Sequence, residues 1–281
     1  MKPSRFDYLA PTTVAEAVSV LADRAGDAVV LAGGQSLVPA LNFRLGAPAA
    51  LVDVNGVDGL SGLDGDGGGT LRIGALVRHR ELVENAHACP ILAIAARHIG
   101  HVPIRNRGTV GGSVAHADPA AEIPAVLALL DGAVELTSTR GTRAVPIEEF
   151  ILGPYFTTKE QDELVTALIL RPSTASWGFH EVARRPGDFG LAGAAASLTL
   201  DGDHVREARI ALLGVEPAPR RIPDVELGLA GVPVAEAVDA AAAAVRTADI
   251  DVLEDPHVPS DYRRHLAAIA VGRAVGQAVS A

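Results

Sequence analysis

The chain has a single cysteine, Cys89, among its 281 residues. One thiol cannot form a disulfide within the chain, and it cannot supply the ligands of an iron–sulfur cluster or a cysteine-rich zinc site. Long apolar runs are also missing, since none reaches the roughly 18 uninterrupted apolar residues of a membrane-spanning helix. The N-terminus lacks the basic and apolar pattern of a secretion signal. These absences predict a cytoplasmic protein with no membrane span.

Aromatic residues and positive charge are scarce as well. Phe, Trp and Tyr make up 4% of the chain, and the formal net charge is −10 at pH 7. This acidic balance argues against nucleic acid as a partner, because a phosphate backbone needs basic surface. One local basic stretch runs from Arg72 to Arg107, and it is either a solvated face or a surface that meets an anion or a partner. The abundant small apolar residues suit an α/β protein long enough for two domains.

Glycine is plentiful, and one glycine pair follows a short apolar run. The segment AGGQSL occupies residues 32–37, between an expected strand over 28–31 and an expected helix over 36–44. Paired glycines let backbone N–H groups turn toward a ligand, and a helix N-terminus favours an anion. The segment is not G-x-G-x-x-G, a P-loop or G-x-S-x-G. It is either a strand-to-helix turn without a ligand or a loop that binds pyrophosphate.

A second glycine pair lies in RGTVGGSVAHAD, residues 107–118, ahead of an expected apolar helix over 123–130. It too combines paired glycines with hydroxyl residues, which add hydrogen-bond donors. Either segment alone is compatible with ordinary turn chemistry. Two of them in one chain suggest a large dinucleotide that is held from both ends.

The two segments together resemble a known family. AGGQSL and TVGGSVAHADPAAE are similar to the FAD-binding medium subunit of molybdenum hydroxylases, which include carbon monoxide dehydrogenase and xanthine dehydrogenase. The opening FDYLAPTTVAEA, residues 6–17, is similar to the start of that family, and SDYRRHL, residues 260–266, to its last helix. The resemblance therefore covers nearly the whole chain.

The resemblance implies which residues hold FAD. The backbone N–H groups of residues 33–36 would bind the pyrophosphate, with help from the Ser36 hydroxyl. The second segment would touch phosphate and ribitol, and Glu122 would hold ribose hydroxyls unless it is only a charge at a helix start. The full implied set is Leu31, Ala32, Gly33, Gly34, Gln35, Ser36, Leu37, Thr109, Gly111, Gly112, Ser113, His116, Asp118, Glu122, Val165, Asp188 and Phe189.

A third region, RRPGDF at residues 184–189, corresponds in the family to a hairpin beside the flavin ring. Phe189 would be the apolar side chain at the isoalloxazine and Asp188 its polar neighbour, with Val165 lining the same pocket. From the residues alone, the region is equally a hairpin turn with two exposed arginines. The flavin is expected to be non-covalent, because neither glycine segment offers a cysteine. The histidines at 98, 101 and 116 lack a carboxylate that would complete a metal site.

The order of expected elements predicts an α+β fold. Helix 13–25 and strands 28–31 and 50–54 form a first α/β subdomain, and strands 71–75, 133–138 and 164–170 with helix 91–99 form a second. The resemblance implies that these subdomains, about 1–55 and 56–174, make an FAD-binding domain of the PCMH/vanillyl-alcohol-oxidase type over 1–174. Three antiparallel strands over 177–184, 192–201 and 204–214, with helices over 234–247 and 260–277, would make a C-terminal domain over 175–281, after a linker at 171–176.

No Ser/His/Asp or Cys/His set and no paired-carboxylate pattern emerges, which fits a protein whose reactive atoms belong to a cofactor. The resemblance implies an electron-transfer subunit that passes electrons from a partner's [2Fe–2S] clusters through FAD to an external acceptor. Its partners would be a large subunit with molybdenum cofactor and a small subunit with two [2Fe–2S] clusters, as a dimer of heterotrimers. Two alternatives remain open: a stand-alone FAD-binding module without turnover, and a self-sufficient flavin oxidase.

Overall fold

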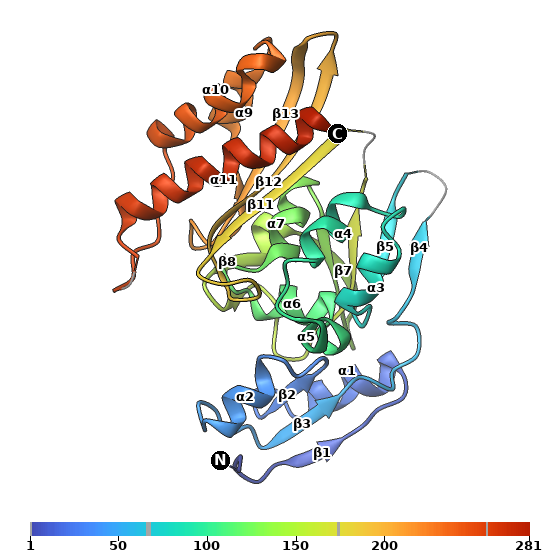
Figure 1. Cartoon of the computed structure of the whole chain (residues 1–281). Coiled ribbons are helices and arrows are strands. Elements are labelled where there is room, and N and C mark those ends of the chain that lie inside the picture. Colours follow the sequence, from blue (N-terminus) through green and yellow to red (C-terminus); the bar gives the residue numbers. More distant parts are fainter. Residues whose placement is uncertain (1, 66–68, 173–174, 257) are drawn as a thin grey trace.

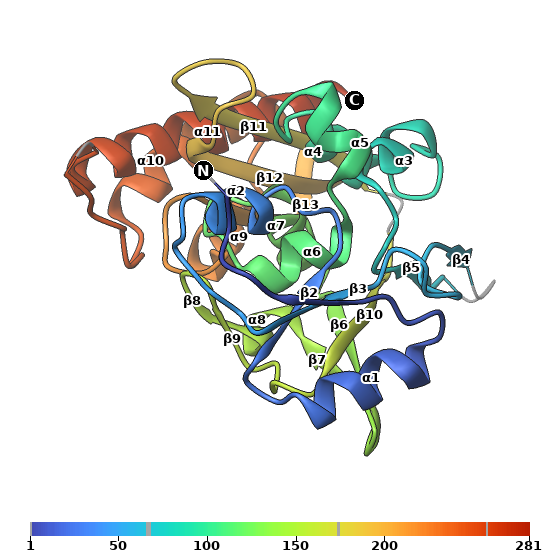
Figure 2. The same cartoon turned by 90° about the horizontal axis from the view of Figure 1, so that it is seen from below.

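The computed structural model describes residues 2–65, 69–172, 175–256 and 258–281. Three parts of the chain are stacked on one another, with the N-terminal part at the bottom of Figure 1 and the C-terminal part at the top. Figure 2 shows the same stack from below, with the N-terminal part nearest the viewer. No helix among the described residues is both long and apolar enough to cross a membrane.

The N-terminal part is a three-stranded parallel sheet in the order β1-β3-β2. Its helix α1 begins with a capping box, in which Thr13 and Glu16 satisfy each other's backbone N–H groups. The buried stripe of α1 packs on the sheet face that carries Val52. The elements are β1 (Asp7–Leu9), α1 (Val14–Asp23), β2 (Ala28–Leu31), α2 (Leu37–Asn42) and β3 (Ala50–Asp53).

The middle part is a five-stranded antiparallel sheet in the order β4-β5-β10-β6-β7, and its described residues also form six short helices and a small hairpin. All residues from Ile123 to Leu129 of α7 are buried, which matches the continuous apolar run of the sequence. The strands are β4 (Leu63–Gly65), β5 (Leu71–Gly74), β6 (Ala133–Ser138), β7 (Gly141–Pro146), β8 (Ile151–Gly153), β9 (Phe156–Thr157) and β10 (Leu164–Leu170). The helices are α3 (His79–Glu84), α4 (Pro90–Ala96), α5 (Val102–Arg107), α6 (Val110–His116), α7 (Glu122–Leu129) and α8 (Ile147–Phe150).

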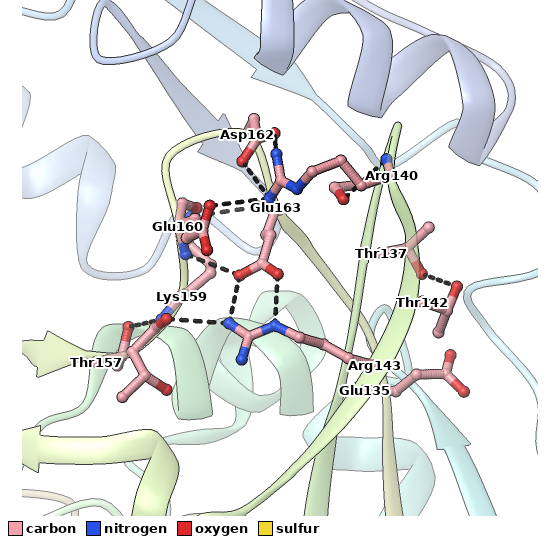
Figure 3. Close-up of polar contacts among 12 residues, drawn as sticks. Glu135, Thr137, Arg140, Thr142, Arg143, Thr157, Lys159, Glu160, Asp162 and Glu163 are labelled. Carbon is pink, nitrogen blue, oxygen red and sulfur yellow. Dashed lines mark hydrogen bonds and ion pairs between the residues drawn. The ribbon is translucent and has the colours of Figure 1, made fainter.

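An ion-pair network ties the β6–β7 hairpin to the segment before β10 (Figure 3). Arg143 donates to both carboxylate oxygens of Glu163, at 2.7 and 2.8 Å, and Glu163 is only 3% exposed. Arg140 pairs with Glu160 and Asp162 at the outer side of the same segment. A bidentate pair on a buried carboxylate fixes the position of this segment, since an unpaired charge there would be costly.

The C-terminal part is an antiparallel sheet in the order β11-β12-β13-β14, with α9, α10 and α11. The three strands expected from the sequence are present, and the short β14 adds a fourth. Gly178 lets α11 approach closely, because a Cβ there would lie 2.7 Å from the Ala274 carbonyl carbon. The elements are β11 (Ser176–Ala183), β12 (Gly190–Asp201), β13 (His204–Leu213), β14 (Arg220–Arg221), α9 (Pro223–Leu229), α10 (Val234–Thr247) and α11 (Ser260–Ser280).

The two faces of the C-terminal sheet belong to different cores. Ala194 and Ile210 face α10 and α11, whereas Phe179, Ala195 and Ala211 join the core of the middle part. The sheet is therefore sandwiched between its own helices and α7. This shared core makes the relative position of the middle and C-terminal parts a consequence of apolar packing rather than of a linker. Of the linker predicted at 171–176, residues 173–174 lie outside the described residues.

Three helices of the middle part were not predicted, namely α5, α6 and the single-turn α8. The second glycine segment is itself helical over α6, where the sequence predicts only a turn before the next helix. Glycine disfavours helix interiors, so its pattern indicates a loop. Here Thr109 caps the helix, and packing against β5 outweighs the intrinsic preference. Helix α5, just before it, has no buried residue and thus no apolar stripe from which it could be predicted.

Candidate cofactor site

The first glycine segment leaves the end of β2 and enters α2. Within the described residues, the backbone N–H groups of residues 33–36 have no protein acceptor. The segment is partly exposed, and Gln35 folds back to donate its amide to the Gly33 carbonyl at 3.1 Å. Four consecutive unsatisfied N–H groups at the start of a helix form a concave donor surface that suits an anion.

Both glycines are required by the geometry of this segment. Gly34 has φ of +73°, in the left-handed region that side chains disfavour. Gly33 packs directly on the second segment, since a Cβ at position 33 would lie 2.8 Å from the Cα atom of Gly108 and closer still to the Arg107 carbonyl oxygen. The structure thus brings the two glycine segments into contact, as expected for two sides of one binding site.

A cavity of about 360 Å³ opens at this contact. It is lined by Leu31, Gly33, Gly34, Gln35, Val38, Pro39, Asp53, Asn55 and Arg107. The guanidinium of Arg107 forms no ion pair within the described chain, which leaves its charge open to the cavity. Burial alone would raise the pKa of Asp53, but hydrogen bonds from Tyr8 and Asn55 and the charge of Arg107 hold that pKa below its ordinary value.

The N-terminus of α6 offers no comparable row of free donors. Gly111 donates its N–H to the Ala75 carbonyl at 2.9 Å, and Gly112 donates to the Thr109 hydroxyl at 3.1 Å. Ser113 donates to the Thr109 carbonyl. The predicted contacts of this segment with phosphate would therefore come from side-chain hydroxyls or close main-chain approach. A Cβ at Gly111 would lie 2.9 Å from the Ala75 Cα atom, so this glycine is needed for packing of α6 on β5.

The far end of α6 carries His116 and Asp118, and a tyrosine that the sequence did not single out lies beside them. The ring of Tyr155 is 5.1 Å from the His116 ring, and its hydroxyl donates to Asp118 at 3.3 Å. Tyr155 has φ of +59°, an unusual backbone conformation for a side chain of this size. An exposed aromatic held in a strained conformation next to two site candidates extends the candidate surface along α6.

Glu122 begins α7 and interacts with a second carboxylate, Glu181 of β11. Burial, and then the charge of Glu181, raises the pKa of Glu122 to about 8. Burial raises the pKa of Glu181 to about 7. One carboxylate oxygen of Glu181, Oε2, is buried without a hydrogen-bond partner in the described chain. Two carboxyl groups that resist ionisation are suited to share or donate a proton to a bound polar group.

Glu181 also lines a larger cavity of about 780 Å³, between the α4–α5 connection and the β11–β12 hairpin. Basic side chains dominate its wall, and α5 links it to the smaller cavity, because Arg105 lines the larger one and Arg107 the smaller one. The hairpin turn packs closely on the α4–α5 connection, since a Cβ at Gly187 would lie 2.6 Å from Nδ1 of the His101 ring and closer still to its Cε1 atom. Residues of α5 thus line both cavities, which suits a ligand with two separate ends.

The other predicted residues are placed as follows. Phe189 is 74% exposed on the hairpin, and Asp188 pairs with Arg185 at 3.3 Å. Val165 is buried in the core of the middle part and lines neither cavity, so its contact with a cofactor stays a prediction. No group of three metal-ligating side chains occurs among the described residues. His98 packs on the ring of Phe179 instead.

The sequence did not single out Asn55 and Arg78, which connect the two glycine segments, or Tyr8 and Asp53 beside Asn55. Their only signals were a polar pair directly after a strand and a position in the basic stretch. Such signals are weak because they depend on which strands become neighbours. The residues present nevertheless fit a dinucleotide: a row of free N–H donors, an unpaired guanidinium and a glycine position that a Cβ would fill lie at one cavity.

Two protein-family models match the chain. The family described as FAD binding domain in molybdopterin dehydrogenase matches residues 4–172. The family described as CO dehydrogenase flavoprotein C-terminal domain matches residues 177–278. Together these two matches span nearly the whole chain.

Several relatives match the chain over its full length. The nicotine 6-hydroxylase medium subunit of Paenarthrobacter nicotinovorans is 36% identical, over 99% of both chains. The carbon monoxide dehydrogenase medium chain of Hydrogenophaga pseudoflava is 34% identical, over 99% of this chain and 98% of that one. The solved structure of quinoline 2-oxidoreductase from Pseudomonas putida 86 superposes with a TM-score of 0.92 and 36% identity, over 100% of this chain and 99% of that chain. The chain belongs to the FAD-binding medium subunits of the molybdenum hydroxylases, which are oxidoreductase subunits.

Proposed function

We propose that this chain is the electron-transfer subunit of a heteromeric molybdenum hydroxylase. It would receive electrons from [2Fe–2S] clusters of a small partner subunit and pass them to an external acceptor. When bound, FAD supplies the redox chemistry that links one-electron carriers to such an acceptor. The chain's own residues bind and orient the cofactor, and the large partner subunit holds the molybdenum cofactor and selects the substrate.

The observation that carries this proposal is the row of free N–H groups over residues 33–36 beside the unpaired Arg107. A diphosphate is the anion that this surface suits, because it offers several oxygens along one line. Ser36 belongs to the first glycine segment and Arg107 to the second. The Ser36 hydroxyl and the Arg107 guanidinium would therefore hold the two phosphates from both sides.

The remaining roles follow from position along the site. Thr109 and Ser113 supply hydroxyls at the start of α6, and His116, Asp118 and Tyr155 border the surface at its end. Glu122 would hold ribose hydroxyls. The Arg184–Phe189 hairpin would lie at the isoalloxazine, with Phe189 as its apolar side chain and Asp188 next to it.

We further propose that the subunit works in the cytoplasm within a dimer of heterotrimers. Relatives are named as subunits or chains of larger enzymes, such as the 6-hydroxypseudooxynicotine dehydrogenase complex. The functional division would fall near residue 175, with the FAD-binding domain over 1–174, its subdomains about 1–55 and 56–174, and a C-terminal domain over 175–281. The gap between the two family matches, at residues 173–176, supports this boundary.

The test has two steps. The purified chain is expected to show a flavin spectrum and to take up FAD on reconstitution; a colourless chain that binds no FAD would rule out the proposal. The chain is then mixed with its small and large partners, and flavin absorbance is followed after substrate is added. Reduction only with both partners present supports electron transfer, whereas FAD binding without any reduction favours a stand-alone FAD-binding module. Turnover of substrate by the isolated chain would instead favour a flavin oxidase.

A further inference from the structure

A closed chain of contacts connects the two glycine segments at the smaller cavity. Asn55, just after β3, donates its side-chain amide to the Ala32 carbonyl at 2.9 Å and to Asp53 at 2.6 Å. Its amide oxygen accepts a hydrogen bond from Arg78 at 2.7 Å. Arg78 also donates to the Arg107 carbonyl, the same group against which Gly33 packs. The ring of contacts thus returns to the first segment.

The side chain of Arg78 does not line the cavity, in contrast to Arg107. Its fork of N–H groups spans two acceptors from different parts of the chain, which a guanidinium can do and a single ammonium group cannot do with the same geometry. At the backbone level, Arg78 and Thr109 form a β-bridge, and His79 donates its N–H to the Gly108 carbonyl at 3.1 Å. Residues 78–79 therefore hold the second segment in two ways, while Asn55 holds the first.

The contacts of Arg78 also affect the charges near the cavity. A free carbonyl oxygen near a bound anion would repel it, but the Arg107 carbonyl accepts a hydrogen bond from the Arg78 guanidinium. Burial, and then the neighbouring charge of Arg107, lowers the pKa of Arg78. Two guanidinium groups held near each other repel, and an anion in the cavity relieves that repulsion.

We propose that Asn55 and Arg78 are positioning residues that clamp the two glycine segments at the separation needed to hold a dinucleotide diphosphate. This inference rests on the proposed FAD-binding function and adds two residues outside the glycine segments. Asn55 lines the smaller cavity, whereas Arg78 does not, so Arg78 would act on the cofactor without touching it. Their shared effect is exerted through the carbonyls of Ala32, which directly precedes the cavity-lining Gly33, and of Arg107.

The test is a double-mutant cycle on the full chain after FAD removal. FAD is titrated into the wild type, Asn55→Ala, Arg78→Met and the double variant, with Arg80→Met as control, because Arg80 is exposed and two residues from Arg78. Each single variant is expected to weaken FAD binding about 10–100-fold, since charge-assisted hydrogen bonds are lost. The double variant should be weaker than either single variant by no more than about threefold, because both residues serve one clamp.

Two further probes separate positioning from general loss of structure. ADP, which carries the diphosphate, should lose affinity by the same factor as FAD, whereas AMP should change by less than about threefold because one phosphate needs only one segment. Arg78→Lys keeps the charge but not the fork, and it should recover only a small part of the affinity.

The possible results separate failure of the clamp from failure of the proposed function. Unchanged FAD affinity in Arg78→Met, multiplicative effects in the double variant, equal losses for ADP and AMP, or full recovery by lysine would each overturn the clamp while the FAD-binding function stands. A wild-type chain that binds no FAD would instead contradict both the proposed function and the clamp.

Discussion

Gly33 lies against Gly108, so that a Cβ atom at position 33 would stand 2.8 Å from the Gly108 Cα atom. The obstacle is main chain, which cannot rotate away as a side chain can. Any residue larger than glycine at position 33 must therefore separate the two segments or distort one of them.

Gly33→Ala is accordingly expected to weaken FAD binding by about 1–3 kcal/mol, because the donor surface of one segment moves relative to the other. The measurement is an FAD titration of the deflavinated chain. Gly46→Ala is the matched control, since nothing lies within 4 Å of a Cβ there. Equal FAD affinity in both variants would mean that the contact between the segments has no part in binding.

Gly111→Ala should behave differently, because Gly111 serves packing of α6 on β5. A Cβ at this position meets Ala75, and we expect a loss of about 1–3 kcal/mol in the free energy of unfolding even without cofactor. Urea denaturation of the FAD-free chain measures it. Gly228→Ala, which has open space around its Cβ, is the control. If Gly111→Ala kept normal stability but lost FAD binding, Gly111 would serve the ligand rather than the packing of α6.

The Arg143–Glu163 pair predicts a dependence of stability on acid. The Arg143 hydrogen bonds hold the pKa of Glu163 below its ordinary value, so the stabilisation is present above that ordinary value and is lost as pH falls through the folded-state pKa. Glu163→Gln should cost about 1–3 kcal/mol of unfolding free energy at pH 7, less than a fully buried pair because Arg143 is partly exposed.

Urea denaturation at pH 7 and at pH 4 checks this expectation. The difference between wild type and Glu163→Gln should shrink at the lower pH, and Glu149→Gln, an exposed change on α8, should alter neither value. An undiminished difference at pH 4 would show that the effect is steric rather than electrostatic.

Glu122 predicts the opposite pH dependence. Its pKa is raised from the ordinary 4.5 to about 8, so the protonated form fits the folded state, and stability is lost as pH rises through about 8. Glu122→Gln cannot ionise, and the FAD-free variant should keep about 1–3 kcal/mol of the stability that wild type loses between pH 5 and pH 8.5. Denaturation curves at both pH values measure it, and parallel pH profiles for the two proteins would contradict the assignment.

Elements whose local apolar pattern matches their burial could be predicted from the sequence, whereas most contacts between distant segments could not. Strands β6 and β10 and helix α10 match their expected bounds residue for residue, because their apolar periodicity is fixed by burial against a core. The contact of Gly33 with Gly108 agrees with the expectation of one site built from two segments. Helix α6 was missed because Thr109 capping and the Ala75 contact outweigh glycine's low propensity. Asn55 and Arg78 could not be predicted, since their partners are carbonyls brought close only by the packing of separate strands.

Phe189 provides the last prediction, on the hairpin beside the larger cavity. Two hypotheses differ on this residue: a core residue of the C-terminal sheet would cost about 3–5 kcal/mol when truncated, whereas a cover of the flavin ring would not. With 74% of Phe189 exposed, Phe189→Ala is expected to change the free energy of unfolding by less than about 0.5 kcal/mol.

FAD should stay bound in Phe189→Ala, because the proposed phosphate and ribose contacts come from the glycine segments and Glu122 rather than from the hairpin. Removal of the aromatic ring should let oxygen or another acceptor approach more freely, so reoxidation of the reduced flavin is expected to change several-fold and the flavin absorption bands to shift. Melting temperature and reoxidation rate are measured on the same sample, with Leu227→Ala, another strongly exposed apolar residue on α9, as control. Unchanged reoxidation in both variants would show that Phe189 does not control access to the ring, and that its exposed side chain serves a surface other than the flavin site.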